Sequence, residues 1–352
     1  MTLSLQSKRN IRSILIFTSF TTGGAMINAV ISQGFKFYPI INEFFIGLLF
    51  GLITSISEIY FLEEKLRRMR FSTALLIRTT FYVVICALII IAVGLSRIGS
   101  RVDSEYYDII EHHGSLIAYI TSGEFIELLI YSVLLSFFVN FIRQINRLLG
   151  QNVLLNYVRG KYQLPLEEEL IFMFLDLKSS TTIAEKIGLK KNHEFLNDFF
   201  YDMTEPILEF KGRIYQYVGD EIVLTWTMKD GIKNANCIEC FFRIQKNIQK
   251  KKAVYMEKFG VYPEFKAGLH FGKVITGEIG EIKKDIVYHG DTVNTSSRIQ
   301  TECNTYNKIL LISKNLLDKL NLEDKYKAES MGNIKLRGKE KELELCSIEE
   351  IS

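Results

Sequence analysis

Four long apolar stretches dominate the first 145 residues of the chain. We predict four membrane-spanning helices, at about 12–33, 40–62, 74–96 and 117–142. Each is close to the roughly 20 residues that an α-helix needs to cross a bilayer. The first stretch is too long for a cleaved signal peptide and lacks a small-residue cleavage site. Residues 1–142 are therefore expected to form an α-helical membrane domain.

After Pro165 the pattern changes to short apolar strands that alternate with amphipathic helices. Strands are predicted at about 170–175, 213–218, 221–226, 264–270, 273–279 and 286–289. Helices are predicted at about 180–187, 192–210, 232–259 and 292–303. This mixture favours an α+β fold built from split βαβ units over residues 165–352.

Residues 143–164 connect the two halves as a predicted helical linker. Apolar residues recur at near-heptad spacing over about 140–158, which predicts a helix that continues the fourth span. Gly160 and Pro165 then end the pattern. The stripe could pair with a second chain or pack on its own domain. We favour the pair, because the chemistry considered below requires a dimer.

The distribution of charge predicts the orientation of the membrane domain. Basic residues flank the spans on one side, at Lys8, Arg9, Arg12, Lys65, Arg67, Arg68, Arg70, Arg143, Arg147, Arg159 and Lys161. The third loop is instead acidic, with Asp103, Glu105, Asp108 and Glu111. Positive charge concentrates on the cytoplasmic side of membrane proteins. Both termini and the second half are therefore expected in the cytoplasm, beneath the inner (plasma) membrane.

A few polar residues lie near or within the predicted spans: Glu43, Glu58, Glu124, Glu127 and Asn140. Charge buried in lipid is costly and often functional. Most of these residues fall near span ends, however, where the membrane interface can solvate them. We therefore expect solvated positions for most of them.

Composition removes several other kinds of protein from consideration. The net charge of +3 gives no support for a nucleic-acid partner. The five cysteines form neither a disulfide framework nor a double CxxC metal pattern. Cys237 and Cys240 lie in a helical pattern and are expected to be packing residues.

One segment joins a predicted strand to a helix through a polar turn. The strand ends in Asp176, Leu177 follows it, and a polar turn with Ser179, Ser180 and Thr181 opens the helix. Backbone N–H groups at a helix start can hold phosphate oxygens, and a carboxylate beside them can hold Mg²⁺.

Two further segments carry candidate chemistry. Asp220 lies at the tip of a predicted hairpin, and two carboxylates that converge on one site suit two-metal phosphoryl chemistry. Asn294 and Arg298 are four residues apart and share one helix face. An arginine so placed can stabilise phosphate charge during displacement. Each signal is weak alone, since such residues also serve as caps, turns and solvated faces.

Taken together, these segments resemble a known family. FMFLDLKSSTTIAE, GRIYQYVGDEIVLTW, GLHFGKVITGEIG and HGDTVNTSSRIQ resemble the signature blocks of class III adenylate and guanylate cyclases. The whole chain resembles bacterial members with four transmembrane helices. The resemblance implies a ferredoxin-like βαββαβ catalytic domain that works as a homodimer, with its sites at the interface. It also implies conversion of a nucleoside triphosphate into a 3′,5′-cyclic monophosphate.

The resemblance further implies roles for individual residues. Asp176, Leu177 and Asp220 would hold two Mg²⁺ or Mn²⁺ ions per site. Asn294 and Arg298 of the other chain would stabilise the transition state, and Arg337 would contact phosphate. The implied partners are a nucleoside triphosphate, membrane lipid and a second copy of the chain.

Base selection departs from the usual pattern of this family. Adenylate cyclases usually carry lysine at the position of Gln216 and aspartate or threonine at that of Val287. Guanylate cyclases typically carry glutamate and cysteine there. An amide can donate and accept, so Gln216 is compatible with several bases. ATP is the first expectation on family frequency, with GTP or a pyrimidine triphosphate as alternatives.

Three rival interpretations explain the sequence less completely. A diguanylate cyclase would account for Gly219-Asp220-Glu221, but the Asn294 and Arg298 block has no place there. A catalytically silent cyclase-like receptor does not explain why both aspartates, Asn294 and Arg298 are present. A transporter would account for the four spans alone.

Overall fold

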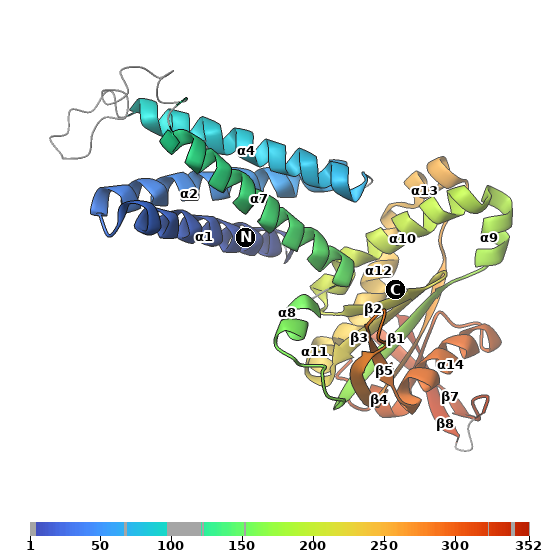
Figure 1. Ribbon diagram of the computed structural model, residues 1–352. Helices are drawn as coiled ribbons and strands as arrows, with labels where there is room; N and C mark the ends of the chain where they lie inside the picture. The colour runs from blue at the N-terminus through green and yellow to red at the C-terminus, as the bar shows by residue number, and fades with distance from the viewer. Residues whose placement is uncertain are drawn as a thin grey trace. The chain divides into compact units, whose positions relative to one another are not determined.

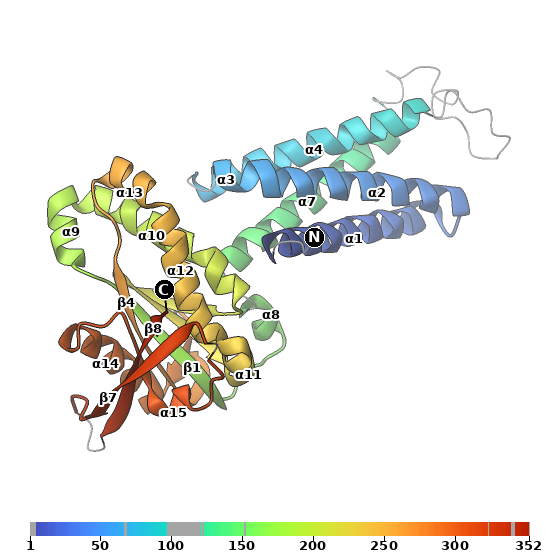
Figure 2. The same ribbon diagram turned by 180° about the vertical axis from the view of Figure 1, so that it is seen from behind.

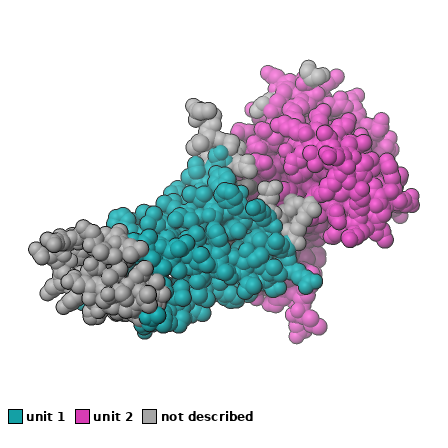
Figure 3. All heavy atoms as spheres, turned by 90° about the horizontal axis from the view of Figure 1, so that it is seen from above, with its two compact units in different colours: residues 1–149 teal, residues 150–352 magenta. Residues whose placement is uncertain are grey.

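The computed structural model describes residues 5–66, 69–96, 121, 123–150, 153–322, 324–338 and 342–351. The chain forms two compact units, Met1–Leu149 and Gly150–Ser352, coloured separately in Figure 3. The acidic loop predicted at 103–111 lies outside the described residues. Arg67 and Arg68, two of the basic residues that flank the predicted spans, also lie outside them.

The first unit contains four long apolar helices (Figure 1). They are α1 (Leu5–Gln33), α2 (Phe37–Ser57), α4 (Phe71–Ser96) and α7 (Gly123–Leu149). Short helical segments η1 (Glu58–Leu62) and α3 (Glu63–Leu66) extend α2. Windows long and apolar enough to span a membrane cover Asn10–Ile31, Ile40–Leu62, Phe71–Ala92 and Phe125–Asn146. The four predicted apolar helices are thereby confirmed.

Two glycines allow α1 and α2 to pack closely. A Cβ atom added at Gly51 would stand 2.3 Å from Thr21 Oγ1 and 2.7 Å from Thr18 Cα. The Thr21 hydroxyl donates a 3.1 Å hydrogen bond to the carbonyl oxygen of Gly47. Small residues that let two backbones approach are a common basis of helix association in membranes.

The substitution Gly51→Leu is expected to destabilise this unit by about 1–3 kcal/mol, because the added side chain must displace the α1 backbone. The full-length protein in detergent should lose its helical circular dichroism at a lower temperature. Gly23→Leu is the matched control, since a Cβ at Gly23 meets nothing within 4 Å. Equal shifts for the two variants would contradict this packing.

Glu58 corrects the expectation that the polar residues of the spans are solvated. Glu58 is 6% exposed, and its carboxylate accepts hydrogen bonds from Arg78 Nε at 3.0 and 3.2 Å and from the Tyr82 hydroxyl at 2.8 Å. Asn140 is also buried, at 1% exposure. An oppositely charged partner offsets part of the cost of burying the Glu58 carboxylate.

The second unit is an α+β domain around one mixed sheet (Figures 1 and 2). Its strands are β1 (Leu166–Leu177), β2 (Arg213–Val218), β3 (Glu221–Thr227), β4 (Phe265–Ile279), β5 (Asp285–His289), β6 (Leu310–Ser313), β7 (Tyr326–Ile334) and β8 (Leu343–Glu350). Its helices are α8 (Val153–Val158), α9 (Ser180–Ile187), α10 (Leu189–Glu209), α11 (Met228–Ile232), η3 (Lys233–Ala235), α12 (Asn236–Lys250), α13 (Lys252–Phe259), α14 (Asp291–Thr305) and α15 (Lys314–Leu317).

The sheet has the order β2-β3-β1-β4-β6-β8-β7, and β5 pairs with β4. The first four strands pair antiparallel in the order β2-β3-β1-β4, with helices between β1 and β2 and between β3 and β4. This is the predicted ferredoxin-like βαββαβ arrangement, and it is confirmed.

The central strand β1 is buried on both faces. Ile171, Met173 and Leu175 point into the main core, which includes residues of α10 and α12. Leu170, Phe172 and Phe174 point to the opposite face and pack with Val223 and Val274. Because side chains alternate along a strand, Asp176 belongs to this second face.

Three predicted element boundaries are wrong. The strands expected at 264–270 and 273–279 form one strand, β4, because it pairs with β1 without a break from Phe265 to Thr276. The single helix expected at 232–259 is divided by Ala235 (φ 49°) and by Lys251. The helix expected at 140–158 is interrupted, since α7 ends at Leu149 and Gly150 has a φ of +93°.

The last part of the linker belongs to the catalytic unit. Tyr162 is 6% exposed, and its carbonyl oxygen accepts a 3.2 Å hydrogen bond from Glu278 N–H of β4. Lys161 Nζ lies 2.9 Å from Glu168 Oε1 at the start of β1. Pairing of this linker with a second chain stays a prediction.

The break at Lys251 coincides with a polar network between α10 and the α12–α13 corner. Asp202, 8% exposed, accepts hydrogen bonds from Lys251 Nζ at 2.6 Å and from the Tyr255 hydroxyl at 2.8 Å. Asn247 Nδ2 donates to the Asp202 carbonyl oxygen at 2.6 Å. The network ties the α12–α13 corner to α10.

Asp202→Ala is expected to destabilise the catalytic unit by about 2–3 kcal/mol, because it leaves buried donors without their acceptor. Asp318→Ala, which removes an exposed ion pair with Lys314, should cost less than about 1 kcal/mol. Denaturant unfolding followed by the fluorescence of Trp226 in the core provides the measurement. A cost for Asp202→Ala no larger than that of the control would refute this role.

Candidate active site

Sheet pairing brings the two predicted aspartates together. The register aligns Asp176 on β1 with Glu221 on β3 and with Lys266 on β4. Asp220 directly precedes Glu221 in the β2–β3 turn, where Gly219 has a φ of +63° that favours glycine. The carboxyl groups of Asp176 and Asp220 lie within hydrogen-bonding reach of each other.

The carboxyl groups of this site are crowded and partly buried. Burial raises the pKa of Asp176, the neighbouring Asp220 raises it further, and Lys266 partly offsets both effects. Burial, with the charges of Asp176 and Asp220, raises the pKa of Glu221 to about 7. A bound cation would relieve this accumulation of negative charge.

The oxygen donors fit Mg²⁺ or Mn²⁺. Among the described residues, no group of three or more His, Cys, Asp or Glu side chains is placed to enclose a metal ion. Mg²⁺ is commonly held by only one or two carboxylates, with waters and substrate phosphates as its other ligands. Asp176 and Asp220 provide such a pair, and the predicted third contributor, Leu177, is the last residue of β1.

The predicted phosphate contacts surround the start of α9. Ser179 precedes the helix in the left-handed conformation, with φ 56°. Ser179 and Thr181 are exposed and Ser180 is half-buried. N–H groups at such a helix start can bind phosphate oxygens, and the predicted contacts lie three to five residues beyond Asp176.

Asn294 and Arg298 point away from the aspartates of their own chain. Both lie on α14, from which Gln300 Nε2 donates a 3.1 Å hydrogen bond to Asp176 Oδ2. Successive helical residues are rotated by about 100°, so Arg298 and Asn294 lie roughly 160° and 120° around the helix from Gln300. The Arg298 side chain instead lies beside Gly338, where an added Cβ would be 3.4 Å from Arg298 Nη2. This contact brings Arg298 and the Arg337 turn together.

The two predicted base-selecting residues flank an aromatic contact between β2 and β5. The Tyr288 N–H donates a 3.4 Å hydrogen bond to the Tyr215 hydroxyl, and the two rings are 4.7 Å apart. Gln216 follows Tyr215 and is exposed, and Val287 precedes Tyr288 and is half-buried.

Lys266, Gln300 and Glu221 were not among the residues predicted for the site. All three depend on sheet register or on the packing of α14, which local sequence patterns do not specify. Of the three, only Glu221 could have been suspected from the sequence, because it directly follows the predicted metal ligand Asp220.

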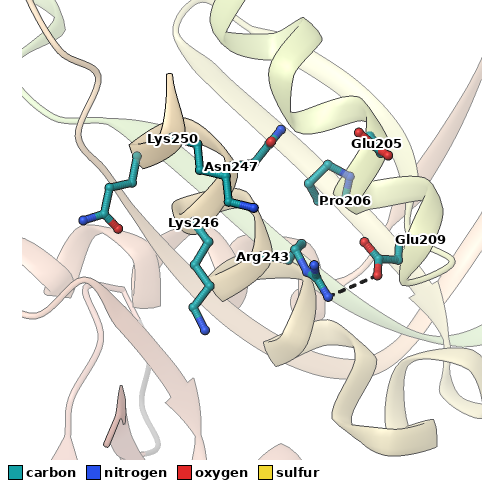
Figure 4. A pocket seen from close by; sticks show the side chains of 8 residues that line it. Glu205, Pro206, Glu209, Arg243, Lys246, Asn247 and Lys250 are labelled. Atoms are coloured by element: carbon teal, nitrogen blue, oxygen red, sulfur yellow. Dashed lines mark ion pairs between the residues drawn. The ribbon is translucent and has the colours of Figure 1, made fainter. Parts of the chain in front are cut away.

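A charged groove of about 380 Å³ lies elsewhere in this unit, between α10 and α12 (Figure 4). It is lined by Glu205, Pro206, Glu209, Arg243, Lys246, Asn247, Gln249 and Lys250. Arg243 and Glu209 form a 3.3 Å ion pair across it. The groove contains none of the predicted site residues.

Comparison with known proteins identifies the second unit. Residues 163–348 match the family model of the adenylate and guanylate cyclase catalytic domain. Adenylate cyclase 2 of Rhizobium meliloti (strain 1021) is 35% identical over 223 residues, which are 63% of this chain and 61% of that protein. A receptor-type guanylate cyclase of Caenorhabditis elegans is 25% identical over 176 residues, 49% of this chain and 17% of that protein.

A bacterial light-regulated adenylyl cyclase of known structure shares the fold, with a TM-score of 0.54 and 18% identity over 63% of this chain and 65% of that chain. The present chain thus spans less than two thirds of these relatives. The family match covers more than half of the chain and includes every predicted site residue. The chain belongs to the adenylate and guanylate cyclase family.

Proposed function

We propose that this protein is a membrane-bound adenylate cyclase that converts ATP into 3′,5′-cyclic AMP and pyrophosphate. The observation that carries the proposal is the meeting of Asp176 and Asp220 at the end of β1, next to the start of α9. Family membership and the 35% identity to a bacterial adenylate cyclase support the same conclusion.

The direction of α14 supports a site shared by two copies of the chain. Gln300 contacts Asp176 of its own chain, and Arg298 is turned to the other side of the helix. Arg298 is therefore poorly placed to reach a substrate bound at its own aspartates. A homodimer solves this problem, because each chain can contribute carboxylates to one site and Asn294 and Arg298 to the other.

In the proposed reaction, the ribose 3′-oxygen attacks the α-phosphorus in line and pyrophosphate leaves. Two Mg²⁺ or Mn²⁺ ions at Asp176, Asp220 and Leu177 would lower the pKa of the attacking hydroxyl and offset phosphate charge. The N–H groups at Ser179, Ser180 and Thr181 hold the phosphates. Asn294 and Arg298 stabilise charge that develops during displacement, and Arg337 contacts the leaving phosphates.

ATP is proposed as the substrate on the strength of the relative with 35% identity. Gln216 can donate to or accept from a base edge, and Val287 contributes only packing. GTP or a pyrimidine triphosphate would use the same metal and phosphate contacts. The chemistry therefore depends on Asp176, Asp220 and Arg298, and the choice of base depends on Gln216 and Val287.

The membrane unit is proposed to anchor the enzyme in the inner (plasma) membrane, with lipid around it and both termini in the cytoplasm. The four apolar helices and the basic residues that flank them support this topology. Substrate and product would then lie on the cytoplasmic side.

The proposal is tested with the purified full-length protein in detergent. Addition of ATP and Mn²⁺ should yield cyclic AMP, and removal of the metal with EDTA should stop the reaction. Cross-linking should trap a dimer. A folded, dimeric protein that makes no cyclic nucleotide from any triphosphate would instead favour a silent cyclase-like receptor.

A further inference from the structure

A buried lysine lies directly behind the proposed metal site. Lys266 on β4 is 7% exposed and is aligned with Asp176 in the β1–β4 register. Its Nζ atom lies 3.3 Å from Asp176 Oδ2 and 2.7 Å from Asn304 Oδ1. A buried ammonium group is costly unless it is paired, so these two contacts are its compensation.

Gln300 provides a second donor to the same carboxylate oxygen. Its side chain is 6% exposed, and Nε2 donates to Asp176 Oδ2 at 3.1 Å. Gln300 and Asn304 are one turn apart on α14 and so lie on one helix face. The helix is held close to β4 at this point, since a Cβ on Gly268 would stand 2.2 Å from Gln300 N. We name Lys266, Gln300 and Asn304 the Asp176 brace.

The brace opposes an excess of negative charge. The carboxyl groups of Asp176, Asp220 and Glu221 are close enough to repel one another, and Lys266 is the cation that acts on both Asp176 and Glu221. Two donors on Oδ2 fix the orientation of the Asp176 carboxylate. Groups that hold a metal ligand from behind commonly set the affinity of the site.

We propose that Lys266 is a built-in counter-cation, which balances the charge of Asp176 when no metal is bound, and that Gln300 is a positioning residue, which orients Asp176 for the metal. This inference rests on the proposed function, because it takes Asp176 as a metal ligand. The two residues then affect metal binding in opposite directions. Gln300 favours it by orienting the ligand, whereas Lys266 opposes it by competing for the same negative charge.

Mn²⁺ binding to the full-length protein in detergent tests the brace without any turnover. Free Mn²⁺ is followed by electron paramagnetic resonance, alone and with 3′-deoxy-ATP, which lacks the attacking hydroxyl. Gln300→Leu leaves the net charge unchanged and should weaken Mn²⁺ binding about 10-fold or more. Lys266→Met removes a positive charge 3.3 Å from Asp176 and should tighten binding by about 10-fold.

Three control variants accompany these measurements. Gln249→Leu makes the same substitution at an exposed position of α12 and should bind Mn²⁺ like the wild type. Lys266→Arg keeps the positive charge and should bind Mn²⁺ less tightly than Lys266→Met. If Lys266→Met does not fold, Lys266→Arg alone tests the role of the charge. Mn²⁺ affinity close to that of the wild type would then support the role of the charge. Asp176→Asn defines the loss expected when the ligand itself is removed.

The outcomes separate the brace from the proposed function. Weaker binding in both Gln300→Leu and Lys266→Met would overturn the brace and indicate loss of packing alone. Unchanged binding in both, with loss in Asp176→Asn, would overturn the brace and leave the metal site intact. A wild type that binds no Mn²⁺ in either condition would overturn the metal site, and the brace with it.

Discussion

Asp220→Ala is expected to lower cyclase activity by about 1,000-fold or more. Metal ions at such a site stabilise the transition state by several kcal/mol, and each 1.4 kcal/mol changes the rate tenfold. Asp220 is half-buried in the β2–β3 turn, and the substitution removes one of the carboxyl groups that repel each other around Asp176. The folded state should therefore persist while activity is lost.

The measurement is initial-rate formation of cyclic AMP by the full-length protein at saturating Mn²⁺. Asp324→Ala removes an exposed aspartate of the same unit and should retain wild-type activity. Thermal unfolding of each variant confirms that the proteins compared are folded. An Asp220→Ala protein with half the wild-type rate would exclude Asp220 from the metal site.

Arg298→Ala and Asp176→Ala are each expected to be inactive alone but to regain activity when they are co-expressed. In a mixed dimer, the Arg298→Ala chain supplies intact aspartates and the Asp176→Ala chain supplies intact Asn294 and Arg298. One of the two sites is then complete. Random pairing makes half of the dimers mixed, so about one quarter of wild-type activity should return.

Two different affinity tags on the chains allow the mixed dimers to be isolated. Asp176→Ala paired with Asp220→Ala provides a matched control, because both changes damage the same half of the site and no complete site can form. Recovery in the first pair and none in the second is the expected pattern. Purified mixed dimers of the first pair without activity would contradict a shared site.

Local patterns in the sequence were sufficient to predict much of the fold. The four apolar stretches exceed bilayer thickness, and the alternation around Asp176 and Asp220 predicts β1 and the β2–β3 hairpin. The errors arose where tertiary contacts override local preference. β4 continues through Gly272 because it pairs with β1 along that length, and α12 ends at Lys250, before Lys251, whose side chain reaches Asp202. Strands β6, β7 and β8 were not predicted at all.

The site was predicted as separate segments, and their meeting depends on register. Asp176 and Asp220 come together only because β1 pairs with β3, as the βαββαβ order requires. Nothing in the sequence around Lys266 or Gln300 indicates a role in the site. One is a lysine in a strand and the other a glutamine on an amphipathic helix. Their contacts with Asp176 follow from the packing of α14 on β4. Glu58 was expected to be solvated because its partner Arg78 is 20 residues away.

The product made from each nucleotide decides whether this protein is an adenylate cyclase. The purified full-length protein is incubated with Mn²⁺ and with ATP, GTP, CTP or UTP separately, and products are identified by mass spectrometry, with Asp220→Ala alongside. We expect cyclic AMP and pyrophosphate from ATP, and no product from the variant. A different cyclic nucleotide would refute ATP as the substrate. No cyclic nucleotide from any of the four would contradict the assignment as a cyclase.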